Sequence, residues 1–200
     1  NILYANADGT PNNYKDLPLK NEVLTIDEAA HRIRMTPLVQ AATRLHRRDV
    51  IEKIHFPDGK NYEDAFTTPT IFEKSTAVAC VEEMLYHYRL HSSSIMHEKV
   101  GLKNLDEIDA NYGLLQCALR HGKKDTALLE YKIMERYFKK IMKNLPPEDQ
   151  NDPKVQQTID LIRKAETEVR QAGADTLRNK LEAAVWFRNK TVYYHLKGWA

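Results

Sequence analysis

The sequence predicts an all-α fold, either an irregular helical bundle or a set of stacked helix pairs, with an antiparallel helical hairpin at the C-terminus. Glycine is scarce, with 7 residues in 200, whereas the helix-favouring residues Leu, Ala, Glu, Lys and Arg are plentiful. Apolar residues recur at helical spacing in several segments. Capping and stop signals separate these segments. We expect seven to nine helices.

The first half of the chain opens irregularly and then shows two helix starts. Ile2–Tyr4 could form a short strand before the Asp8-Gly9 turn. Thr25 to Glu28 has the form of a capping box and predicts a helix to about Met35. Thr36-Pro37 predicts the next helix, because Thr is a good N-cap and Pro suits the first helical position. Its expected inward face consists of Leu38, Ala41, Ala42 and Leu45.

The middle of the chain is interpreted as a loop followed by a long helix. Phe56 to Thr70 has the composition of a loop. Ile71 to about Ser92 then predicts a helix. Its core candidates are Val78, Val81, Leu85 and Tyr88.

Asn111 to Leu129 is interpreted as a helix, a tight corner at Gly122 and the start of a second helix that runs to about Met142. Leu115 and Ala118 are expected in the core, together with Leu129.

The C-terminal quarter predicts two helices after a strong break at Pro146-Pro147. Asp152-Pro153 is a start signal for a helix over 156–172, and Gly173 ends that helix. Asp175 or Thr176 caps a last helix over 177–197. We expect a helical domain over residues 1–145, with an irregular N-terminal segment, and a helical hairpin over residues 152–200 packed on it.

The net charge and the cysteines bear on the expected partner and the expected location of the protein. The net charge is only +2, so the overall charge gives no indication of a nucleic-acid partner. Cys80 and Cys117 lie in apolar, helical contexts and predict buried free thiols, which favours an intracellular, cytoplasmic location. No apolar run approaches the roughly 20 residues that span a bilayer. Because the chain begins at Asn1, we expect it to be part of a larger protein.

Three stretches resemble the ankyrin repeat family. Leu115, Ala118, Gly122, Ala127 and Leu129 match the spacing of the family's helix–turn–helix corner. Thr36-Pro37-Leu38 resembles the start of a repeat, and Thr68-Pro69 follows Thr36-Pro37 at close to the family's period of about 33. The resemblance covers residues 25–130 at most, and Leu is missing after Thr68-Pro69. It implies stacked helix pairs that bind proteins without catalysis.

Glu83, His87 and His91 are the candidate metal ligands. They stand at i, i+4 and i+8, which would align them on one helix face. The alternative is a polar face, since no further ligand is indicated. We therefore assign no metal site and expect no cofactor.

Arg44, Arg47 and Arg48, with His46 and Lys53, form a basic cluster. Such a cluster could hold a phosphate, an acidic partner surface or RNA. The alternative is a solvated helix end, balanced by nearby acidic residues.

Trp186, Phe187 and Arg188 mark an aromatic and basic C-terminal helix. Such a helix can dock into a partner's groove or lie on a membrane surface. The alternative, which we favour, is that the aromatic side chains pack the hairpin onto the main body.

The sequence therefore predicts a protein–protein interaction module that binds another protein through a helical surface. The residues proposed to bind this partner are Arg44, Arg47, Arg48, Trp186, Phe187 and Arg188. No nucleophile motif, phosphate loop or catalytic residue can be assigned. The alternative from another class is a helical enzyme, or an enzyme lobe, with a His/Glu/Arg site.

Overall fold

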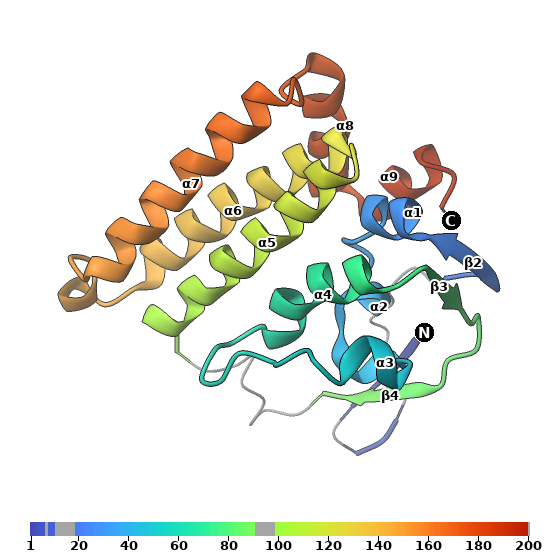
Figure 1. Ribbon diagram of the computed structural model, residues 1–200. Helices are drawn as coiled ribbons and strands as arrows, with labels where there is room; N and C mark the ends of the chain where they lie inside the picture. Colours follow the sequence, from blue (N-terminus) through green and yellow to red (C-terminus); the bar gives the residue numbers. More distant parts are fainter. Residues whose placement is uncertain (7, 11–18, 91–98, 200) are drawn as a thin grey trace.

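The computed structural model describes residues 1–6, 8–10, 19–90 and 99–199, and helices dominate this part of the chain (Figure 1). The prediction of a helical protein is confirmed. The described residues form nine α-helices and four short strands. None of the described helices is long and apolar enough to cross a membrane.

The longest helices form one side of the molecule (Figure 1). They are α5 (Asp106–Arg120), α6 (Lys124–Asn144) and α7 (Pro153–Gln171). The other helices are shorter: α1 (Ile26–His31), α2 (Thr36–Val39), α3 (Arg48–Ile51), α4 (Glu63–Lys74), α8 (Leu177–Arg188) and α9 (Lys190–Leu196).

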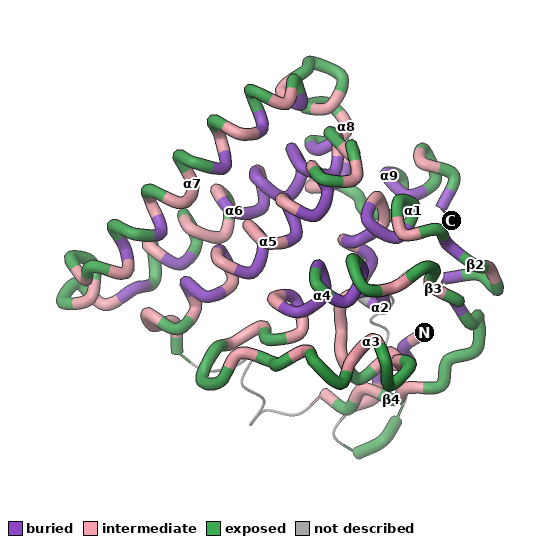
Figure 2. Tube along the Cα trace, viewed as in Figure 1, coloured by how far each residue is buried: buried purple, intermediate pink, exposed green. Residues whose placement is uncertain are grey.

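The pair α5–α6 is the centre of the fold. Figure 2 shows that both helices are buried along much of their length. Leu114, Ile133 and Met134 are fully inaccessible to solvent. One face of the pair packs with α4, α1 and the C-terminal aromatic residues, and the other packs with α7, so two core clusters meet along α5 and α6.

The corner between α5 and α6 confirms the predicted hinge at Gly122. Its φ of +68° is a left-handed conformation that side-chain-bearing residues rarely adopt. The N–H of Lys123 donates to the carbonyl of Ala118 at 2.8 Å, and that of Gly122 donates to Leu119 at 3.0 Å. These two bonds form a Schellman motif, which satisfies carbonyls at the end of α5 and turns the chain into α6.

Several helix starts follow the predicted caps. Thr25 and Glu28 form the expected capping box at α1. The side chain of Asp152 accepts from the N–H of Lys154 at the start of α7, and that of Thr176 accepts from Asn179 at the start of α8.

Two small sheets lie at the end of the molecule away from α7 (Figure 1). The predicted strand at the N-terminus is present as β1 (Ile2–Ala5) and pairs in parallel with β4 (Tyr86–Arg89). The second sheet joins β2 (Glu22–Thr25) to β3 (Ala77–Cys80) in antiparallel order, with Leu24 opposite Val78.

The prediction of a long helix from Ile71 to Ser92 was wrong. Helix α4 begins earlier, at Glu63 inside the expected loop, and ends at Lys74. The hydroxyl of Ser75 bonds the carbonyl of Ile71 at 2.7 Å, and the backbone of Ser75 is extended. The following residues then form β3, because β-branched side chains such as Val78 suit a strand. Val81 and Leu85, expected in the core, are exposed.

The helix expected from Thr36-Pro37 is short. Helix α2 ends at Val39, and a single 3₁₀ turn over Ala41–Thr43 follows. Leu38 is buried as predicted, but the side chain of Leu45 is fully exposed.

The last predicted helix is divided at Asn189, whose side chain accepts from the N–H of Val192 and caps α9. Both α7 and α8 pack mainly on α6. Leu177 and Leu181 are exposed, whereas Tyr193 and Trp199 are buried. The division of the chain into residues 1–145 and 152–200 stays a prediction.

An ionic cluster holds the C-terminal segment to the body. Lys197 donates from Nζ to Asp125 at 2.6 Å and also contacts Glu182. His31 of α1 lies 2.7 Å from the same Asp125 carboxylate. The Trp199 ring packs edge-on against His31, so one acidic residue of α6 joins α1 to the C-terminal segment.

A buried ion pair lies between the α1–α2 connection and α6. Arg34 Nη2 is 2.9 Å from Glu130 Oε2 and donates to Asn111 Oδ1 at 2.8 Å. Neither carboxylate oxygen of Glu130 accepts a well-aligned hydrogen bond. Burial raises the pKa of Glu130 to about 7, and the charge of Arg34 opposes this effect only in part.

We predict that Gly122→Ala lowers the free energy of unfolding by about 1 kcal/mol, because Ala would have to adopt the left-handed conformation. Gly101→Ala is the control, since Gly101 is extended and its Cβ would meet open space. Urea denaturation measures both. Equal stability of the two variants would contradict the role assigned to Gly122.

We predict that Glu130→Gln changes how stability depends on pH. The unfolded chain loses the Glu130 proton near pH 4.5 and the folded chain only near 7, so this group makes wild-type stability fall as pH rises between those values. The variant lacks this pH-dependent loss of stability. Its free energy of unfolding should therefore rise by roughly 3 kcal/mol relative to that of wild type as the pH increases from 4.5 to 7. Denaturation midpoints at several pH values test it, with exposed Glu148→Gln as the control.

Candidate functional site

A cleft of about 770 Å³ lies beside β3, the end of α4 and the segment before α3. This volume falls in the range of small-ligand and peptide sites. The lining residues are Asn1, Leu19, Pro37, Leu38, residues 42–47, Asp49, Val50, Ile71, Phe72, residues 74–81, Leu85 and Tyr86.

The cleft follows the edge of β3 that faces away from β2. Every residue from Lys74 to Val81 lines it, although neighbouring side chains of a strand point to opposite faces of a sheet. A cavity that touches both faces must therefore pass along the strand's edge. No residue of β2 lines the cleft, so this edge is the one that β2 leaves free.

The backbone of β3 has unused hydrogen-bonding groups on that edge. In an antiparallel pair, alternate residues direct their N–H and C=O groups to the partner strand, and the others point outward. Within the described ranges, residues 76–80 make no backbone hydrogen bond outside the pairing with β2. The free edge ends at Val81, whose carbonyl accepts from Asn1 Nδ2 at 2.9 Å.

Exposed apolar side chains surround the cleft. Leu45, Leu85 and Val81 are among the most exposed large apolar residues, and all three line it. Buried Phe72 and Leu38 add apolar surface deeper in the wall. An apolar surface of this kind beside an unpaired strand is typical of an interaction site.

Arg44 is the central cation of the cleft wall. Its Nη1 donates to Thr68 Oγ1 at 3.0 Å and to the carbonyl of Leu38 at 3.3 Å. Nε and Nη2 are buried and have no hydrogen-bond partner in the structure. Burial lowers the pKa of Arg44 to about 10, an effect that Asp64 opposes. Arg44 therefore stays charged at neutral pH without an ion pair among the described residues.

The positive charge of Arg44 also acts on the nearby His46 ring. Burial lowers the pKa of His46, and the positive charge of Arg44 lowers it further. Since both residues line the cleft, a positive potential exists at this wall.

Part of the predicted basic cluster lines the cleft. Arg44 and Arg47 line it, whereas Arg48 does not. Arg47 is exposed and pairs with Asp49 at 2.8 Å. Lys74 at the end of α4 adds a cation that the sequence interpretation had not singled out.

Cys80 lines the cleft but has no features of a nucleophile. Burial raises the pKa of its thiol, and Glu22 raises it further. A protonated thiol is a poor nucleophile. Cys117 is also buried, and both cysteines are free.

The candidate metal ligands Glu83 and His87 do not lie on one helix as expected. Glu83 lies in the connection after β3 and His87 in β4, so the two do not share a helix face, which corrects that expectation. His91 lies outside the described residues. Among the residues that are described, no group of three or more His, Cys, Asp or Glu side chains could hold a metal ion.

The C-terminal candidates are placed mainly in the core. Trp186 is buried on α8, and Phe187 packs edge-on against it with ring centroids 5.1 Å apart. Arg136 stacks over the Phe187 ring. Only Arg188 of this set is exposed. The aromatic rings thus complete the core, in agreement with the favoured alternative.

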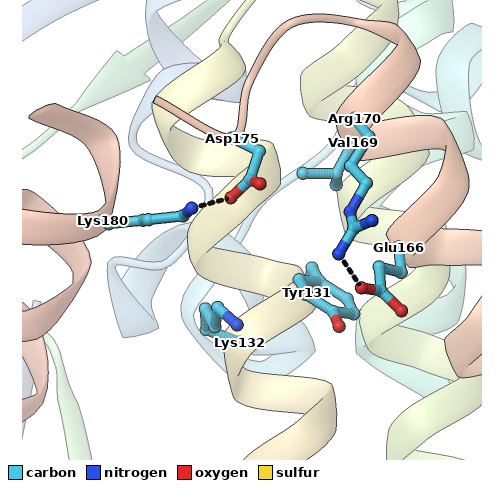
Figure 3. A pocket seen from close by; sticks show the side chains of 7 residues that line it. All are labelled: Tyr131, Lys132, Glu166, Val169, Arg170, Asp175 and Lys180. Atoms are coloured by element: carbon cyan, nitrogen blue, oxygen red, sulfur yellow. Dashed lines mark hydrogen bonds and ion pairs between the residues drawn. The ribbon is translucent and has the colours of Figure 1, made fainter. Parts of the chain in front are cut away.

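A second, smaller pocket of about 110 Å³ lies between α6, α7 and α8. Figure 3 shows two ion pairs among its charged side chains. Lys180 bonds Asp175 at 2.9 Å, and Arg170 bonds Glu166 at 2.6 Å. Lys132 bonds Glu135, outside the pocket, at 2.7 Å. Since its cations are already neutralised, we assign this pocket no ligand.

Compared with known proteins, the chain matches no family model, no curated protein and no solved structure. The ankyrin resemblance therefore stays a prediction. Thr36-Pro37 does begin a helix, the four-residue α2, but Thr68-Pro69 lies inside α4.

We predict that Arg44→Gln raises the pKa of His46, because one of the two causes that lower it is removed. An NMR titration of the His46 ring measures this. Arg48→Gln, which removes an exposed charge outside the cleft, should leave the His46 titration unchanged. An unchanged His46 pKa in Arg44→Gln would show that the Arg44 charge does not act on this wall.

Proposed function

We infer that the chain is a protein-interaction module whose cleft accepts an extended segment of a partner protein as an added strand beside β3. The observation that carries this proposal is the course of the cleft along the free edge of β3. A strand edge offers ready-made donors and acceptors to another chain, and peptide-binding domains use such edges.

The length of β3 suits a short partner segment. The four residues of β3 extend over about 13 Å, at roughly 3.3 Å per residue. A partner strand of similar length would pair with this edge. Its alternate side chains would then meet the wall around Phe72 and the exposed Leu45 and Leu85.

Burial of these apolar side chains would add to the backbone hydrogen bonds. Leu45, Val81 and Leu85 are exposed to water in the free chain, and covering them is favourable at about 25 cal/mol per Å² of apolar area. The hydrogen bonds provide affinity that depends little on sequence, whereas the side-chain contacts provide selectivity.

The enzyme alternative has less support. The cleft contains Arg44, His46 and Cys80, but the Cys80 thiol is held in its protonated form. Glu83 and His87 are not among the residues that line it. The ankyrin resemblance also implied protein binding, but the present proposal does not depend on it.

The test begins with random linear peptides displayed on phage and selected on the full chain. We predict that a selected peptide slows amide hydrogen exchange at residues 76–81, because the outward N–H groups of β3 become bonded. Ala79→Trp should weaken binding at least tenfold, since Ala79 is exposed and lines the cleft.

Ala184→Trp is the matched control, because Ala184 is exposed on α8 and does not line the cleft. It should bind the peptide as wild type does. Protection confined to other segments, or equal binding by both Trp variants, would contradict the proposal.

A further inference from the structure

We propose that the segment accepted beside β3 carries acidic side chains, which offset the unpaired positive charge of Arg44 and Lys74 in the cleft. This inference rests on the proposed function and names the chemistry of the partner segment.

The first support is the state of Arg44. Charged groups are rarely buried without a partner of opposite charge, because removal from water is costly. Arg44 lines the cleft with two guanidinium nitrogens that have neither solvent nor a hydrogen-bond partner. A carboxylate in the cleft would supply the missing opposite charge in a region of low dielectric, where such an interaction is strengthened.

The second support is the balance of charge over the whole lining. Among the lining residues that the structure describes, Arg44, Arg47 and Lys74 carry basic side chains, and Asp49 carries the one carboxylate. Asp49 is already bonded to Arg47. Lys74 has no ion pair with a described residue. The cleft therefore keeps two cations, Arg44 and Lys74, that have no ion pair with a described residue, although Asp64 acts on Arg44 from nearby.

The distribution of these charges favours acidic side chains over a single chain terminus. Arg44 follows the 3₁₀ turn at Ala41–Thr43, whereas Lys74 ends α4. The single carboxylate at a chain terminus would pair with only one of these two cations. Side chains two residues apart on a strand lie about 7 Å apart on the same face, so a strand with alternate acidic residues can present more than one carboxylate.

The lining also favours a peptide over a nucleic acid. Among the described lining residues the aromatic rings are those of His46, Phe72 and Tyr86, and Phe72 is buried, so these residues form no exposed row of rings on which bases could stack. The free backbone groups of β3 instead match those of an extended polypeptide.

The experiment compares two end-capped peptides on the full chain, one alternating Val with Glu and the other alternating Val with Gln. Acetyl and amide caps remove terminal charges from both. We expect the Glu peptide to bind at least tenfold more tightly. Lys74→Gln and Arg44→Gln should each reduce that preference several-fold, measured as the ratio of the two peptides' affinities for the same variant. Lys143→Gln, an exposed site on α6, is the control of equal charge.

Each outcome separates this inference from the proposed function. Equal affinity for both peptides, with exchange protection at residues 76–81, overturns the acidic preference and keeps the strand-binding site. A preference that survives in both Lys74→Gln and Arg44→Gln also overturns it. Displacement of the Glu peptide by a mixed-sequence oligonucleotide as effectively as by unlabelled Glu peptide would favour nucleic acid. Absence of protection at β3 with either peptide contradicts the proposed function itself.

Discussion

The packing of α5 against α6 is the constraint on which the rest of the structure depends. The Gly122 corner sets the two helices against each other, and their facing residues, including Leu114 and Ile133, are fully buried. Helix α7 covers one side of this pair, while α4, α1 and the C-terminal rings cover the other. Because interiors are close-packed, each later element is positioned by the surface that the pair presents.

The cleft follows from how α4 sits on that pair. Helix α4 packs on α5 and stops at Ser75, so the chain leaves the helical body as β3. Among the described residues only β2 pairs with β3, and a two-stranded sheet leaves an edge on each strand. Arg44 is fixed against α4 through Thr68, which places a cation beside this edge. The same helix therefore anchors the strand and its charged neighbour.

Local signals explain what the sequence could predict. The caps at Thr25 and Asp152 and the corner at Gly122 depend on residues within one or two turns and were predicted correctly, and Thr176 was one of two candidates for the cap of α8. Strand β3 could not be predicted in the same way, because it consists of only four apolar residues, and pairing with the distant β2 is what makes them a strand. The β-branched side chain of Val78 was the available signal.

The candidate site was predictable only in part, for a related reason. Arg44 and Arg47 stood out as a basic cluster, but Lys74 and the edge of β3 join them through tertiary packing that no local pattern specifies. The central claim, that a partner strand pairs with this edge, is tested most directly by isotope-filtered NMR of the chain bound to a selected peptide. The account predicts nuclear Overhauser effects between backbone protons of the peptide and those of residues 77–80. Effects to α7 or α8 alone would contradict it.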